Sequence, residues 1–199
     1  MAKIKLTKNE LKRQKDQLKR FQRYLPTLVL KKQLLQTEVR NVERQIEDKR
    51  LQRQEAFEEL LEWVDVFGEN IAIAHLVQVK EVCTSSTNIA GVDLPILMEV
   101  KFEAVAYDLL AYPFWVDAAV KKLQELATLD MVLSFLEKQA ALLAAELRVT
   151  AQRVNLFEKV KIPETKENIR MINIFLGDQQ TAAVVRGKMA KNKLVRGTI

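Results

Sequence analysis

The chain has 199 residues, of which 48% are hydrophobic and 29% charged, and its formal net charge is +6. Five glycines, four prolines and a wealth of Leu, Ala, Lys, Glu, Gln and Arg favour long helices over a compact mixed fold. One cysteine, Cys83, excludes an intrachain disulfide, and residues 1–5 show no apolar signal core. No window approaches the roughly eighteen apolar residues of a membrane span. We therefore expect a mainly helical, cytoplasmic protein without direct membrane insertion.

Residues 11–67 repeat apolar side chains every seven residues, which is typical of a coiled coil. With Leu11 at heptad position a, thirteen of seventeen a and d positions are apolar. The predicted seam of this arm includes Leu11, Leu18, Phe21, Leu25, Leu28, Leu35, Val39, Val42 and Ile46. Thr7 stands three residues before Glu10, as in a capping box, so we expect the helix to begin near residue 8.

Polar residues and one proline interrupt this first arm. Pro26 removes a backbone hydrogen bond, and we expect a kink there without an end of the helix. Lys32, Lys49 and Arg53 occupy seam positions. Such residues either fix the register of the two helices or mark where the pair opens and a third element docks.

The period changes to two residues between 76 and 103, where apolar and polar side chains alternate on both sides of a turn-rich stretch. This alternation predicts a β-hairpin. Its loop residues are expected in Thr84–Asn88 and Gly91–Pro95, which are rich in turn formers. A lone hairpin is marginal in water, so it must pack on the helices or on a partner.

The second arm is expected to begin after Pro113. Its predicted seam runs through Leu126, Leu129, Leu133, Leu136, Ala140, Leu143, Leu147, Thr150, Val154 and Phe157. Beyond Pro163 the stripe resumes displaced by one residue, as Ile169, Ile172, Leu176 and Ala183, which predicts a kink or break at Pro163. The fold class is therefore mainly α: a long antiparallel two-helix coiled coil of N- and C-terminal arms with a short β-hairpin in the middle segment. The predicted parts are residues 1–70, 71–112 and 113–199.

Charge is concentrated at the two ends of the chain. Residues 1–23 hold nine Lys and Arg against two acids, and residues 179–199 hold five bases and no acid. An antiparallel pair of arms brings these ends together, and the longer second arm protrudes with a basic tip of Arg186, Lys188, Lys191 and Lys193. Such a tip suits nucleic acid, anionic lipid or an acidic protein cavity, or it is a solvated tail.

Residues with the chemistry of catalysis are sparse. His75 is the only histidine, and with Cys83 alone it offers neither a zinc set nor a triad. The five glycines are scattered and form no phosphate loop. Trp63 and Trp115 suit core positions where the arms join better than a partner anchor. We expect no cofactor, no metal and no catalysis by the chain itself.

Three blocks resemble one family. Thr7, Glu10, Leu11 and Leu18, followed by Leu28, Lys31, Lys32 and Leu35, are similar to the opening pattern of the D subunits of V-type and archaeal-type ATP synthases and ATPases. The stretch Asn88–Pro95, with Gly91 and Pro95, resembles the hairpin sequence of that family. The third block matches its C-terminal signature in order and spacing, through Thr150, Arg153, Val154, Asn155, Glu158, Ile162, Pro163, Ile169 and Ile172.

This resemblance implies a central-stalk rotor shaft, one copy per complex, that transmits torque between an ATP-hydrolysing head and an ion-carrying membrane ring. It implies the catalytic A and B subunits, the F subunit and the C subunit of the rotor as partners, and no nucleotide site. The alternative is a coiled-coil scaffold or membrane-tethering protein unrelated to ATPases. A nucleic-acid binder is disfavoured, because the basic segments lack interleaved aromatic residues for stacking on bases.

Overall fold

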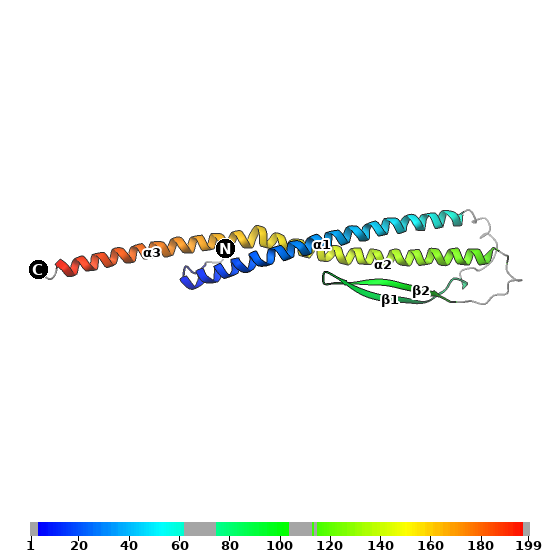
Figure 1. The fold of residues 1–199 in the computed structure, drawn as a ribbon, viewed down its shortest axis with the longest axis horizontal. Helices are drawn as coiled ribbons and strands as arrows, with labels where there is room; N and C mark the ends of the chain where they lie inside the picture. Colours follow the sequence, from blue (N-terminus) through cyan, green and yellow to red (C-terminus); the bar gives the residue numbers. More distant parts are fainter. Residues whose placement is uncertain (1–3, 62–74, 104–112, 114, 197–199) are drawn as a thin grey trace. The chain divides into compact units, whose positions relative to one another are not determined.

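A computed structural model describes residues 4–61, 75–103, 113 and 115–196. Its elements are helix α1 (Lys8–Leu61), strands β1 (Val79–Ile89) and β2 (Val92–Phe102), helix α2 (Val116–Asn155), the π-helical turn η3 (Leu156–Lys161) and helix α3 (Ile162–Arg196) (Figure 1). This order of long helix, β-hairpin and long helix confirms the predicted fold class. The predicted positions Trp63 and Phe67 lie outside the described residues. The chain forms two compact units, one of residues 32–148 and one of residues 1–31 with 149–199.

Helix α1 begins where the capping pattern predicts. The Glu10 backbone N–H donates to Thr7 Oγ1 at 3.3 Å, which satisfies one of the free amides of the first turn. Pro26 lies inside α1 and does not end it. From Leu11 to Leu60, every a and d position of the predicted seam is buried or half-buried.

In the unit of residues 32–148, the second half of α1 lies beside α2 in antiparallel orientation. Two ion pairs define this orientation, since Arg50 pairs with Glu137 whereas the later Glu59 pairs with the earlier Lys122. The two helices and the hairpin share one apolar cluster, whose buried members are Leu35, Val42, Ile46, Leu94, Leu133 and Leu143. The core of this unit therefore has three contributors, and the hairpin supplies Leu94.

Strands β1 and β2 pair antiparallel from Val79 opposite Phe102 to Ile89 opposite Val92. The turn between them is only Ala90 and Gly91, with φ of 53° and 81°. Two positive φ angles in a two-residue loop define the type I′ turn that matches the twist of a β-hairpin. The expected loop was wrong in extent, because Thr84–Asn88 and Val92–Pro95 lie in the strands. These stretches hold residue types that are common in turns, but each of them pairs with the opposite strand of the hairpin.

In the unit of residues 1–31 and 149–199, the rings of Phe21 and Phe157 lie 5.2 Å apart. The buried residues of this unit include Thr150, Val154, Thr165 and Ile172. The chain stays helical through Pro163, so there is no break at that residue. The irregularity is η3, which directly precedes α3, and there the Ile162 N–H donates to the carbonyl of Phe157, five residues back. A π-turn adds one residue to a helix, and this accounts for the one-residue displacement of the apolar stripe.

Candidate interaction site on the helix pair and hairpin

The tip of the hairpin is anchored in the seam of the helix pair. Leu94 is only 1% exposed and packs in the cluster of α1 and α2, with Ile89, Ala90 and Val92 against its edge. Gln139 of α2 donates from Nε2 to the carbonyl of Pro95 at 2.6 Å. The hairpin is thus fixed to the helices by one buried side chain and one hydrogen bond beside it.

The side chain of Asn88 braces the turn. Its Oδ1 accepts from the Gly91 N–H at 3.0 Å, and its Nδ2 donates to Asp93 Oδ1 at 2.7 Å. These bonds offset the cost of the positive φ at Ala90, a residue with a Cβ. Of the family-like residues in this stretch, Gly91 forms the turn and Pro95 supplies the anchoring carbonyl.

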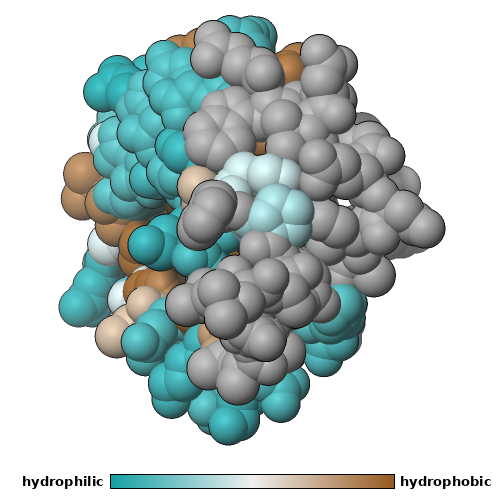
Figure 2. All heavy atoms as spheres, turned by 90° about the vertical axis from the view of Figure 1, so that its right-hand side faces the viewer, coloured by the Kyte–Doolittle hydropathy of each residue, from teal (hydrophilic) through white to brown (hydrophobic). Residues whose placement is uncertain are grey.

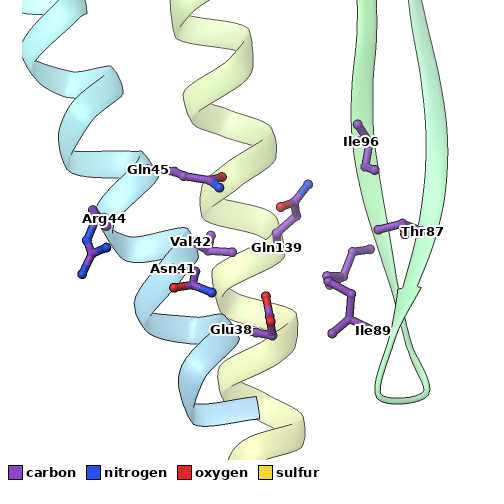
Figure 3. A pocket seen from close by; sticks show the side chains of 10 residues that line it. Glu38, Asn41, Val42, Arg44, Gln45, Thr87, Ile89, Ile96 and Gln139 are labelled. Carbon is purple, nitrogen blue, oxygen red and sulfur yellow. The ribbon is translucent and has the colours of Figure 1, made fainter. Parts of the chain in front are cut away.

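A groove of about 380 Å³ runs between the hairpin and the helices. Figure 3 shows Gln139 pointing from α2 toward the hairpin, with Thr87, Ile89 and Ile96 on the hairpin side. Its lining combines an apolar floor with polar side chains, and α1 contributes Glu38, Asn41, Val42, Arg44 and Gln45. The groove carries both charges and holds no cluster of catalytic groups.

Ion pairs join α1 to α2 across the seam in the described part of the chain. Arg50 Nη2 lies 2.7 Å from Glu137 Oε1, Arg53 Nε lies 3.0 Å from Asp130 Oδ1, and Lys122 Nζ lies 2.6 Å from Glu59 Oε2. The hydrogen bond to Glu59, and then the one to Glu125, raises the pKa of Lys122 above its ordinary value. Each pair is partly exposed and therefore weak, but opposite charges at matching positions disfavour other registers.

The polar seam positions of α1 behave differently from one another. Arg53 pairs with Asp130 on α2, as a residue that fixes register would. Lys49 instead bonds Gln52 of its own helix. The β-hairpin is the third element that docks on the helix pair. It packs at Leu35, Val42 and Ile46, which lie between the polar seam positions Lys32 and Lys49.

The residues of the C-terminal signature lie on and around η3. Arg153, Asn155, Glu158 and Pro163 are exposed, while Val154 between them is buried. Glu158 lies inside the π-turn. The signature therefore marks an irregular helical turn whose charged members lie on the surface, while Thr150 and Val154 are buried.

The basic tip has no cover from the described part of the chain. Arg186, Lys188, Lys191 and Lys193 are exposed, and so is every other described residue from Gly177 to Leu194. Large apolar side chains share this exposure, namely Val184, Val185, Met189 and Leu194. Exposed large apolar side chains beside bases make this helix end a candidate interaction surface.

Other kinds of site find no support in the described residues. No group of three or more His, Cys, Asp and Glu side chains there is placed to hold a metal ion. None of the described helices has a stretch long and apolar enough to cross a bilayer. On the face in Figure 2, hydrophilic residues cover most of the coloured surface and hydrophobic ones form small groups. His75 is exposed and Cys83 is half-buried in β1.

Sequence reasoning missed two of these features. The Gln139 bond to Pro95 is invisible in a heptad pattern, since position 139 lies next to the seam and a backbone carbonyl leaves no sequence signal. The loop predicted over Gly91–Pro95 includes Leu94, although its place between Val92 and Ile96 fits the inward face of a strand.

Two long helices that pair antiparallel in the unit of residues 32–148, with a β-hairpin docked on them, define a mainly α coiled-coil protein. The model of the ATP synthase D-subunit family matches residues 10–192. The chain belongs to this family.

Relatives agree over the full length of the chain. The V-type ATP synthase D subunit of Borreliella burgdorferi is 51% identical over 196 residues, which cover 98% of this chain and 97% of the relative. The proteins of the same name from Chlamydia pneumoniae and Chlamydia muridarum are 35% and 36% identical over 194 and 200 residues. The first alignment covers 96% of this chain and 93% of the relative, and the second covers 97% of each.

Proposed function

We propose that the chain is the non-catalytic central-stalk rotor subunit of a V-type ATP synthase or ATPase, and that it transmits torque between the nucleotide-binding head and the membrane ring. The carrying observation is the unit of residues 32–148, where a heptad seam, three ion pairs and a docked hairpin hold two helices together. Full-length similarity to proteins named as V-type ATP synthase D subunits supports the assignment.

A shaft needs resistance to twisting. Relative slippage of α1 and α2 would expose seam residues such as Leu35 and Leu143, each worth about 1.5 to 3 kcal/mol when fully buried. Slippage would also separate Arg50 from Glu137 and Arg53 from Asp130. The hairpin adds a bulge to one side of the pair in this unit, so that the shaft presents different surfaces to successive subunits as it turns.

The partners follow from the same proposal. The basic tip enters the cavity of the hexameric head of A and B subunits. The F subunit binds the side of the coiled coil, and the end of the shaft away from the basic tip sits on the C subunit of the rotor. One copy serves each complex, and it works in the cytoplasm at the periphery of the membrane. Charged side chains on a solvated helix end give weak, exchangeable contacts, which suits a tip that must turn.

The first experiment is co-purification. The tagged chain should retain a hexameric nucleotide-binding head and a small partner in one-to-one ratio with itself. Self-association alone, with no head retained, would leave the scaffold interpretation standing and reject the rotor.

The second experiment separates torque from assembly. Leu143→Asp places a charge at a fully buried seam position, whereas Ala144→Asp places it on the exposed face one residue later. In reconstituted vesicles, Leu143→Asp should uncouple ion pumping from ATP hydrolysis while Ala144→Asp keeps both. Equal pumping by the two variants, with the complex intact, contradicts torque transmission through this helix pair.

A further inference from the structure

The apolar seam shifts by one residue at η3. The positions that would continue the earlier heptads, called the abandoned phase below, can still be followed along α3. Continued from Val154 and Phe157 by heptad spacing, the seam would run through Lys161, Glu164, Asn168, Met171 and Phe175. The positions one residue further on are Ile162, Thr165, Ile169, Ile172 and Leu176, and all five are buried or half-buried. Of the abandoned phase, Glu164 and Met171 are exposed, Lys161 and Phe175 are half-buried, and Asn168 is buried at the edge of the stripe in use. The π-turn therefore selects one of two possible faces of α3.

Pro163 explains why the π-turn is there. In a regular α-helix its ring would collide with the carbonyl of residue 159, and it has no N–H to donate. In the structure the preceding turn widens, and the Ile162 N–H bonds the carbonyl of Phe157. The proline thus favours the register with the extra residue in η3.

The abandoned phase is apolar from Met171 onward. Met171, Phe175, Ala182, Val185 and Met189 follow one another at intervals of four, seven, three and four residues, with only Asp178 as a polar member. Met171, Val185 and Met189 are 45%, 48% and 53% exposed. The phase in use is more polar at its end, where Gln179 and Arg186 take its positions. Helix α3 therefore carries a second apolar stripe, turned by about 100° from the first.

The described ion pairs among residues 8–30 and 149–193 join residues three apart in the chain. They are Arg13 with Glu10, Lys161 of η3 with Glu164 of α3, and Arg170 with Glu167. The buried Gln14 donates to Glu10 of its own helix, and the buried Thr165 donates to the carbonyl of Lys161. In the unit of residues 32–148, by contrast, three ion pairs cross the seam.

We propose that α3 is a two-register element, in which loss of the π-turn turns the helix by about 100° and exchanges the stripe of Ile172 for the stripe of Met171. Pro163 sets the balance between the two registers. The use of such a step for torsion in a shaft rests on the proposed function, but the two registers themselves do not. The test below measures the registers in the chain alone, so that its outcome is independent of torque.

The test uses thiol labelling of the full-length chain in a Cys83→Ser background. Met171→Cys and Ile172→Cys are introduced separately, and each is combined with Pro163→Ala. With Pro163 present, we expect the thiol at position 171 to react fast with the label and the thiol at position 172 to react slowly. Pro163→Ala should slow the first and speed the second, each by about tenfold. The matched control is Pro26→Ala, a proline inside α1 of the same unit, which should change neither rate.

Further variants keep the proposal falsifiable. Deletion of Val160 from η3 removes the extra residue and should reverse the order of the two rates, with helix content checked by circular dichroism. A thiol at Leu143→Cys reports global unfolding, and the thiol at 172 should react faster than it. The proposal is overturned if Pro163→Ala changes both rates in the same direction or neither, if the deletion keeps the order, or if positions 172 and 143 react alike.

Discussion

At the scale of single residues, the turn of the β-hairpin is the most constrained backbone in the described chain. Gly91 has a φ of 81°, a conformation that a residue with a Cβ adopts only at a cost, and Ala90 before it has a φ of 53°. No atom lies within 4 Å of a Cβ built on Gly91, so the cost of a substitution there is conformational and not steric.

Gly91→Ala should therefore lower the free energy of unfolding by about 1 to 2 kcal/mol. Gly177→Ala is the matched control, because Gly177 lies in α3 with equally open space and ordinary helical backbone. The control should stabilise the helix by up to about 1 kcal/mol. Urea unfolding followed by circular dichroism measures both changes, and an equal loss in the two variants would exclude the conformational explanation.

Leu94 is the residue by which the hairpin contributes to the core. Leu94→Ala should cost about 2 to 5 kcal/mol, because it leaves a cavity among Leu35, Val42 and Leu133. Met98→Ala in the same strand, at a side chain 69% exposed, should cost no more than about 0.5 kcal/mol. The denaturation midpoints of the two variants decide this, and similar values would show that the hairpin adds nothing to the stability of the helix pair.

At the scale of elements, heptad spacing predicted the long helices and their facing residues because burial of an apolar stripe dominates the energetics of a helix pair. The start of α1 followed from Thr7 and Glu10, whose capping bond is local. The π-turn could not be placed from spacing alone, since a displaced stripe fits a proline kink and a one-residue insertion equally well. The two-residue turn at Ala90 and Gly91 does not follow from residue types, because the turn formers Asn88 and Asp93 lie in the strands and brace the turn from there.

The ion pairs between α1 and α2 are predicted to specify register more than stability. Arg53→Glu should destabilise the unit by about 0.5 to 1 kcal/mol, since it sets two carboxylates side by side at Asp130. Adding Asp130→Arg should restore most of the loss by reversing the pair. A double-mutant cycle from chemical denaturation measures the coupling. If the double variant is as unstable as the sum of the single ones, the pair has no role in the register.

At the scale of the whole molecule, the basic tip tests how the chain meets its partner. Lys188, Lys191 and Lys193 lie on an exposed helix end, where a single ion pair contributes about 0 to 1 kcal/mol. Changing all three to Gln should lower ATP-driven ion pumping only modestly in the assembled complex. Changing Lys12, Lys15 and Lys19 to Gln is the control for net charge. Complete loss of rotation in an intact complex with the first set would mean that the tip makes a fixed, strong contact.

The separation of the two arms in the chain has a consequence for biosynthesis. Helix α1 ends at Leu61, whereas the hairpin and α2, which cover its second half, begin at Val79 and Val116, and the ring that packs on Phe21 is Phe157. At about 5 to 20 residues per second of translation, the apolar stripe of α1 stays uncovered for several seconds. The nine bases within residues 1–23 repel other nascent copies during that interval. The positive charge of residues 1–23 thus opposes premature pairing between chains while the ribosome completes the second arm.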